Sequence, residues 1–200
     1  RRLFEQTRQA LAETEALYQA SAELNAAQSY DDILNVLCKY TILGKADRDV
    51  SLIVFDRPWT AEVTPREIQV LARRSSMPTA GLPTRYPVEQ FPSMTLLASR
   101  ETVTISDLAT DSRVDENAKA LFMKTFQARS IVSAALIVAG EWIGYLTGFY
   151  SQPTEFPEAE LRYMMNLVSQ AAVAITSIRR LEETRQALAE TEALYQAARA

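Results

Sequence analysis

Few side chains in this sequence of 200 residues could carry out chemistry, because it contains no histidine and a single cysteine, Cys38. Without histidine there is no Ser-His-Asp triad, no imidazole metal site and no histidine to accept a phosphoryl group. One cysteine cannot form an internal disulfide, a Cys-x-x-Cys pair or an iron–sulfur cluster. The sequence therefore predicts no catalytic residues, no enzyme activity and no metal site. We expect Cys38 to be a small buried apolar residue.

Charged side chains that could act together occur at two places. Asp111, Asp115 and Glu116 could serve in acid–base chemistry or bind Mg²⁺. They stand at the start of a predicted helix, where carboxylates accept hydrogen bonds from free N–H groups, so capping is the favoured role. Arg73 and Arg74 could bind an anion, but we expect them at a solvated strand end.

The composition indicates an ordinary globular protein, with 48% hydrophobic and 23% charged residues. A net charge of −4 gives no general attraction to nucleic acid or to an anionic membrane. The longest apolar region, 133–150, contains Glu141 and three glycines, which indicates two strands rather than a membrane span. We expect a reduced, cytoplasmic piece of a longer protein, with no membrane insertion.

The elements that would position these side chains form a mixed pattern. Helices are predicted over 29–43, 91–99 and 115–126, and strands over 49–56, 66–73, 101–105, 130–138 and 141–150. Only the last two strands are joined by a tight turn, at Gly140. This order predicts an α+β fold with an antiparallel sheet of five or six strands. Helices would pack on one face, and an irregular crossover that includes 77–87 would cover the other.

Along the last predicted strand, alternate residues point to opposite faces of the sheet. Gly144, Leu146 and Gly148 point to one face, which we expect to meet the helices. The opposite face is the predicted ligand-binding surface beneath the crossover. We assign five residues to this surface: Tyr145, Thr147, Phe149, Phe122 and Phe126. Phe122 and Phe126 lie in the predicted helix 115–126 and could also be ordinary core residues.

The two ends of the chain carry the same sequence. Residues 7–20 read TRQALAETEALYQA, and residues 184–197 repeat all fourteen letters at an offset of 177. That period is about one globular domain plus one connector and is too long for a solenoid repeat. We therefore predict a parent protein with tandem copies, in which connector helices at 1–28 and 177–200 flank a domain at 29–176.

Both connectors are predicted to be helical, with apolar residues three or four positions apart. Each helix could pack on its own domain, or it could pair with a second copy in a parallel coiled coil. We favour pairing, because the connector is repeated and a long helix needs a partner to bury its apolar stripe. The predicted homodimer interface comprises Leu3, Leu11, Leu17, Tyr18, Leu24, Leu161, Val168, Ile175, Ile178, Leu181 and Leu188.

The second half of the chain resembles a GAF domain in four short motifs. These are Ser106-Asp107, Asp111-Ser112-Arg113, Ala128-Arg129-Ser130 and Ile143-Gly144-Tyr145-Leu146, with Ala135 where a proline is common. The resemblance covers about 30–176 and implies a PAS-like sheet with a sensory or regulatory role. It also implies tandem domains upstream of a histidine kinase, a cyclase or a phosphodiesterase, and helical connectors that pair in parallel and relay a conformational change.

The same resemblance narrows the ligand. Bilin-attaching GAF domains carry a late cysteine beside a histidine, and haem-binding ones need an axial histidine, so neither cofactor is expected here. The cyclic-nucleotide motif is present only in the wrong order, with Phe126 after Asp115-Glu116. Two hypotheses remain open. The chain is a sensory module of a signalling protein, in particular a sensor histidine kinase, or it is a ligand-free structural spacer.

Overall fold

The computed structural model describes residues 2–78, 83–90 and 100–197, with side chains near the N-terminus described at positions 8 and 11 and from position 14 onward. The helices are α1 (Arg2–Ala26), α2 (Tyr30–Tyr40), η1 (Ile42–Lys45), η2 (Val88–Gln90), α4 (Glu116–Thr125) and α5 (Glu158–Ala197). The strands are β1 (Asp49–Trp59), β2 (Glu67–Ser75), β3 (Arg85–Pro87), β4 (Val103–Ile105), β5 (Ser130–Val138) and β6 (Glu141–Tyr150). None of the helices in these described ranges is long and apolar enough to cross a membrane.

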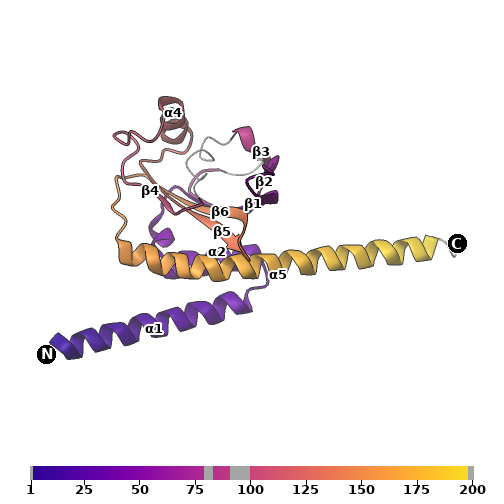
Figure 1. Ribbon diagram of the computed structural model, residues 1–200, viewed down its shortest axis with the longest axis horizontal. Helices are drawn as coiled ribbons and strands as arrows, with labels where there is room; N and C mark the ends of the chain where they lie inside the picture. Colours follow the sequence, from indigo (N-terminus) through magenta and orange to yellow (C-terminus); the bar gives the residue numbers. More distant parts are fainter. Residues whose placement is uncertain (1, 79–82, 91–99, 198–200) are drawn as a thin grey trace.

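The six strands form one antiparallel sheet in the order β3-β2-β1-β6-β5-β4. The predicted α+β class and antiparallel sheet are thereby confirmed. Helices α2 and α5 cover one face, α1 packs on the outer side of these two helices, and α4 lies over the other face (Figure 1). The expectation of helices on a single face therefore holds for three helices and is wrong for α4.

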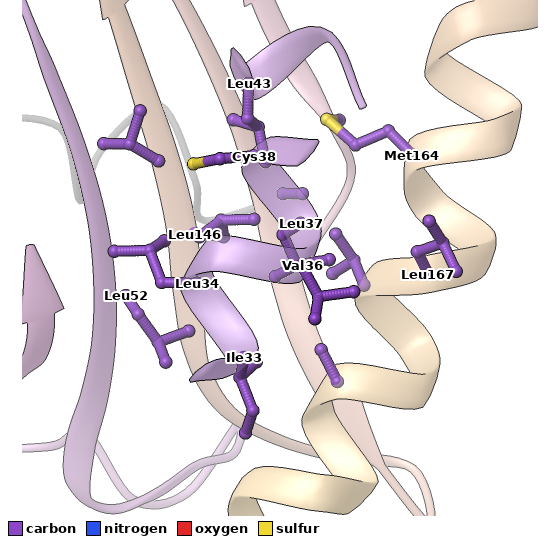
Figure 2. Close-up of a cluster of buried hydrophobic side chains, with 14 of the residues drawn as sticks. Ile33, Leu34, Val36, Leu37, Cys38, Leu43, Leu52, Leu146, Met164 and Leu167 are labelled. Carbon is purple, nitrogen blue, oxygen red and sulfur yellow. The ribbon is translucent and has the colours of Figure 1, made fainter. Parts of the chain in front are cut away.

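The central strands are buried on both faces and read as apolar runs with few polar positions. On the helix face, Val50, Leu52 and Val54 of β1 and Leu146 of β6 pack against α2 and α5. Figure 2 shows this cluster, with α2 between the sheet and Leu167 of α5. Burial of such side chains contributes roughly 1.5–3 kcal/mol each, which fixes both helices on the sheet.

Two local devices set the ends of these elements as the sequence predicts. Ser29 caps α2 by accepting from the Asp32 N–H, while the Asp32 side chain accepts from the Ser29 N–H, which completes a capping box. The β5–β6 hairpin turns at Ala139 and Gly140, with φ of 51° and 81°. Two successive residues of positive φ match the twist of the flanking strands.

The prediction for the glycine-bearing face of β6 holds at one glycine. A Cβ at Gly148 would lie 2.9 Å from Leu43 Cδ2 of η1 and 3.3 Å from Val132 Cγ1, so the missing side chain lets the segment after α2 approach the sheet. At Gly144 a Cβ would instead overlap the backbone of Ile53 in β1. The close approach there is between strands, not to a helix.

The crossover differs from the prediction in two details. Residues 85–87 form the short edge strand β3, where the sequence predicts a loop, and β1 continues past the predicted strand end at residue 56 to Trp59. With three residues, β3 has too few alternating positions to be recognised within the loop-like segment around it. The helix predicted over 91–99 lies outside the described residues.

Helix α5 is 40 residues long, which corresponds to roughly 60 Å at 1.5 Å per residue. Its first half is buried against the domain through Met164, Leu167, Val168, Ala171 and Ile175. Its second half extends beyond the domain, whereas α1 runs in the same direction beside the first half and has its N-terminus at the opposite end of the molecule (Figure 1). The domain is thus attached to one helix that continues well past it.

Candidate functional site

A row of polar side chains crosses the sheet on the face opposite α2 and α5. Arg73 of β2 pairs in register with Ser51 of β1, Ser51 pairs with Thr147 of β6, and Thr147 pairs with Ser133 of β5. Directly paired residues project from the same face of an antiparallel sheet, so these four side chains lie side by side across four strands. Ser51, Ser133 and Thr147 are each at most 6% exposed. The row is therefore a group of buried polar side chains in the middle of an otherwise apolar sheet.

One end of the polar row is an ion pair with a hydroxyl between its members. Arg73 Nε donates to Ser51 Oγ at 3.0 Å and lies 3.3 Å from an Asp49 carboxylate oxygen. Ser51 in turn donates to Asp49. Burial raises the pKa of the Asp49 carboxyl, and the contacts with Ser51 and Arg73 oppose that rise. Asp49 is therefore held in place by both neighbours, and Arg73 keeps little contact with solvent.

The other end of the polar row is less completely satisfied. Ser133 Oγ donates to the Leu146 carbonyl at 3.3 Å. Thr147 Oγ1 is buried and finds no hydrogen-bond partner within the described parts of the chain. An unsatisfied buried hydroxyl destabilises a fold by about 1–3 kcal/mol, so Thr147 is the weakly satisfied member of the row.

Two aromatic clusters flank the polar row. Tyr145 lies in the first, with Phe55 and Trp142, and Trp142 stacks on Trp59 at 4.8 Å between ring centroids. Phe122, Phe126 and Phe149 form the second, with centroid separations of 5.0–6.2 Å. The five predicted ligand-binding residues therefore do not share one lining. Thr147 stands between the clusters, while Tyr145, Phe122 and Phe149 are almost completely buried in them.

Three residues of this polar group, Asp49, Ser51 and Ser133, were missed in the sequence, which suggests for Arg73 only anion binding or a solvated strand end. The expectation that Arg73 lies at a solvated strand end is wrong, because its guanidinium is held by Asp49 and Ser51. A signal does exist in the sequence DVSLIVFD, where Asp49 and Ser51 take the same face as Ile53 and Phe55. Arg74 points to the opposite face and donates to the Leu43 carbonyl at 3.2 Å.

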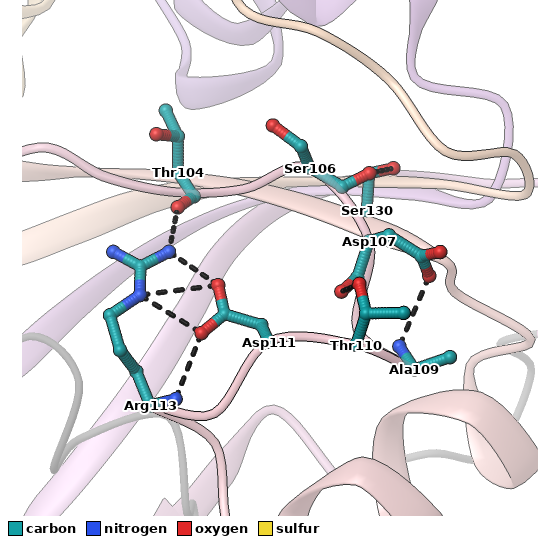
Figure 3. Close-up of polar contacts among 8 residues, drawn as sticks. All are labelled: Thr104, Ser106, Asp107, Ala109, Thr110, Asp111, Arg113 and Ser130. Atoms are coloured by element: carbon teal, nitrogen blue, oxygen red, sulfur yellow. Dashed lines mark hydrogen bonds and ion pairs between the residues drawn. The ribbon is translucent and has the colours of Figure 1, made fainter.

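The acidic motif before α4 is structural. Arg113 bonds to both Asp111 and the Thr104 carbonyl, and Asp107 accepts from the Ala109 N–H (Figure 3). Arg129 also bonds to Asp107, and this hydrogen bond lowers the pKa of the Asp107 carboxyl. These contacts tie the loop after β4 to the start of β5.

The predicted capping role of the carboxylates at the start of α4 is confirmed for Asp115. Asp115 accepts from the N–H groups of Asn117 and Ala118, at 2.9 and 3.0 Å. Glu116 is exposed and pairs with Lys119 one turn later, whose side chain is largely buried. Asp111 instead forms an ion pair with Arg113, in the loop before the helix.

The prediction that Cys38 is a small buried apolar residue is also confirmed. Cys38 lies on α2, and its side chain is buried in the apolar cluster between the helices and the sheet. This burial raises the pKa of the thiol. Figure 2 places it beside Leu43 and on the α2 side of the sheet. The sheet therefore separates the one thiol of the chain from the polar row.

The structure divides the predicted dimer interface into two groups. Leu24, Val168 and Ile175 are buried in the core of the chain itself, and Leu17, Leu161 and Ile178 are partly buried against it. Leu11 and Tyr18 on α1 and Leu181 and Leu188 on α5 are exposed. Leu3 lies within α1, but its side chain is outside the described part of the chain.

Comparisons with known proteins agree with this architecture. The GAF domain family model matches residues 26–175, and no curated protein matches the sequence significantly. The GAF domain from Acinetobacter phosphoenolpyruvate-protein phosphotransferase has a TM-score of 0.62 at 14% identity, covering 86% of this chain and 98% of its own. The phycocyanobilin-bound GAF domain from a cyanobacterial phytochrome has a TM-score of 0.57 at 20% identity, with coverages of 83% and 94%.

A third solved structure shows the same likeness in a different protein context. The GAF domain/HD domain protein from Geobacter sulfurreducens has a TM-score of 0.54 at 17% identity, covering 78% of this chain and 97% of its own. At these identities the structural likeness shows a shared fold alone. The family model matches well over half of the sequence, and its members are regulatory modules of signalling proteins rather than catalysts. The chain therefore belongs to the GAF domain family.

Proposed function

We propose that the chain is a sensory module of a cytoplasmic signalling protein, in particular a sensor histidine kinase. In this proposal it dimerises through its helices and relays a conformational change. The observation that carries the proposal is the continuity of α5, whose first half is part of the core and whose second half leaves the domain. A change in the sheet that shifts Met164 or Val168 must therefore move the protruding half as well.

The proposed relay needs a ligand that distinguishes two arrangements of the helices, because a ligand with equal affinity for both shifts nothing. The polar row offers such a contact. Strand β6 carries Thr147 on the row face and Leu146 on the helix face, so a ligand bonded to Thr147 acts on the strand that also packs against the helices. A small molecule with a hydrogen-bonding group between two apolar ends would complement the row and its aromatic flanks.

The proposed ligand is held without a covalent link. The solved phytochrome domain is described as phycocyanobilin-bound. In this chain the single thiol, Cys38, is buried among the helices on the far side of the sheet. It cannot reach a molecule that contacts Thr147, and the sequence has no histidine to bind haem iron, so we propose that neither an attached bilin nor haem is the cofactor.

The proposed dimer interface is the exposed stripe on the two long helices. Leu181, Leu188 and Tyr195 follow one another at intervals of seven, and Leu11 and Tyr18 repeat the same spacing on α1. A seven-residue repeat of apolar residues keeps a seam facing a partner helix in a left-handed coiled coil.

Sedimentation velocity of the full chain tests this interface. We expect a dimer at micromolar concentrations, and a monomer when Leu181→Glu and Leu188→Glu are combined, because four charges would then face one another across the seam. Gln186→Glu together with Ala193→Glu is the matched control, since both positions are exposed on the same part of α5 but off the stripe. Retention of the dimer by the stripe variant would contradict the proposal.

The second candidate function, a spacer without a ligand, is favoured by one observation. Phe122, Phe126 and Phe149 pack on one another and fill their end of the ligand face with side chains of the chain itself. A thermal-shift screen of nucleotides, amino acids and aromatic acids separates the two functions. Stabilisation that disappears in Thr147→Val supports a sensor, whereas no stabilisation by any compound supports a spacer.

A further inference from the structure

The repeated sequence provides an internal comparison, because the same fourteen residues occur in two different surroundings. In α1, residues 7–20 lead into the part of the helix that packs against α2 and α5. In α5, residues 184–197 form the end that extends away from the domain. Any difference in burial between the two copies therefore reports the surroundings and not the sequence.

The two copies agree on one helix face and differ on another. Leu11 is 58% exposed and its counterpart Leu188 is 59% exposed, and Tyr18 and Tyr195 are likewise exposed. Ala20, by contrast, is fully buried, whereas its counterpart Ala197 is exposed. The same holds for Leu17, which is partly buried in the core, and for its counterpart Leu194, which is 73% exposed.

The repeat therefore has two separate apolar faces. Consecutive residues differ by about 100° around a helix, so Leu17 and Tyr18 look in clearly different directions. The face with Leu17 and Ala20 continues to Leu24, which is buried next to Ala174 and Ile178 of α5. This face serves packing on a domain, and the Leu11–Tyr18 face remains available for a second chain.

We infer that Leu194 and Ala197 form a docking face for the α2–α5 surface of a second copy of this domain that follows in the same protein. The occupant is identified by what the identical residues do at the other end of the chain, where Leu17 and Ala20 lie on that same surface. The inference rests on the tandem arrangement of the proposed function and extends it. One continuous helix would serve as α5 of the first unit and as α1 of the second.

This continuity also sets the spacing of the two units. Leu24 lies beside α5 residues between Gln170 and Ile178, which centre on Ala174. The position that corresponds to Leu24 in the second unit comes four residues after Ala197, or 27 residues beyond Ala174 on the same helix axis. At 1.5 Å per residue, successive domains would be displaced by roughly 40 Å along the helix.

The test joins two copies through the repeat, so that residues 1–197 of the chain are followed directly by residues 21–200. In the unfused chain, Ala197→Asp should leave the unfolding temperature unchanged, while Ala20→Asp should lower it, because Ala20 is buried and Ala197 is exposed. In the fused protein, Ala197→Asp should split calorimetric unfolding into two transitions. The lower transition should carry about half of the unfolding enthalpy, and its midpoint should lie roughly 10 °C below that of the parent fused protein.

Gln196→Asp in the fused protein is the matched control, since both this residue and its counterpart Gln19 are exposed. Leu194→Ala provides a milder variant and should move the same half of the enthalpy by a few degrees, about 2–4 °C. An Ala197→Asp variant as stable as Gln196→Asp in the fused protein would overturn the inference. Sedimentation of the fused protein distinguishes this failure from that of the proposed dimer, because a monomer that still shows the Ala197 effect refutes only the dimer.

Discussion

At the scale of single residues, the polar row depends on an ion pair that is almost completely shielded from water. Asp49 is 4% exposed and Arg73 15% exposed at their side chains, and Ser51 links them. Loss of one member of a buried pair leaves the other charge without compensation. The contacts among Asp49, Ser51 and Arg73 thus fix this end of the polar row, and they depend on both charges.

We expect Arg73→Ala to lower the free energy of unfolding by about 3 kcal/mol, because Asp49 would remain buried without a cation. Arg85→Ala is the matched control: its ion pair with Glu67 joins two exposed side chains and should contribute under about 1 kcal/mol. Urea unfolding followed by tryptophan fluorescence measures both. Equal losses in the two variants would show that the pair at Arg73 is no better shielded than a surface pair.

The Asp107–Arg129 contact predicts a defined pH dependence. The hydrogen bond from Arg129 lowers the pKa of Asp107 below its ordinary value of 3.8. A carboxyl whose pKa is lower in the folded state stabilises the fold above the unfolded pKa, and this contribution is lost as pH falls through the folded pKa. Asp107→Asn should therefore lower the melting temperature at pH 7, and the gap to the parent protein should narrow as pH falls below about 4 and close once pH is below the folded pKa. A gap that stays constant from pH 7 to pH 3 would contradict this assignment.

Residue roles that depend on local sequence could be predicted, and those that depend on strand pairing could not. Capping by Ser29 and Asp115 follows from positions two or three residues away, and the structure confirms it at Asp115 with two hydrogen bonds. The polar row requires the register of β2, β1, β6 and β5, which join residues as far apart as Arg73 and Thr147. No local pattern around Arg73 distinguishes it from Arg74, although the two side chains point to opposite faces.

At the scale of elements, the close contact between β6 and η1 sets how the helix layer sits on the sheet. Gly148 has room for a hydrogen but not for a methyl group, because Leu43 and Val132 are already in contact distance of a Cβ. We expect Gly148→Ala to lower the free energy of unfolding by about 1–3 kcal/mol through overpacking. Thermal unfolding followed by circular dichroism measures it, and an unchanged melting temperature would show that Leu43 can move aside freely.

Elements with a clear sequence pattern were predictable, including the short strand β4, whereas the short strand β3 was not. Helix α5 and the β5–β6 hairpin carry long apolar patterns and a clear turn at Gly140, and both occur where the sequence places them. Strand β3 has three residues and exists because β2 pairs with it through Ile68 and Tyr86. The sequence predicts a strand that ends at residue 56, yet β1 continues through Pro58 to Trp59, which packs on Trp142.

At the scale of the whole molecule, the sheet domain packs against the first half of α5, and the second half of this helix extends beyond the domain. Six of the eleven predicted interface residues pack within the chain itself, as Val168 and Ile175 do. The sequence could not separate the two uses of an apolar stripe, because packing on the domain and packing on a partner require the same residue types. The residues that remain exposed, Leu11, Tyr18, Leu181 and Leu188, are the ones on which the proposed dimer depends.

Disulfide trapping at Leu188 tests the central claim, that the protruding helices of two copies lie parallel and in register. In a parallel pair, Leu188→Cys faces its own counterpart across the seam, while the native Cys38 stays buried. Under mild oxidation we expect most of the Leu188→Cys protein to become a covalent dimer, and Ala193→Cys, exposed on the opposite side of α5, to stay unlinked. Cross-linking of Leu188→Cys no faster than that of Ala193→Cys would contradict the parallel pairing.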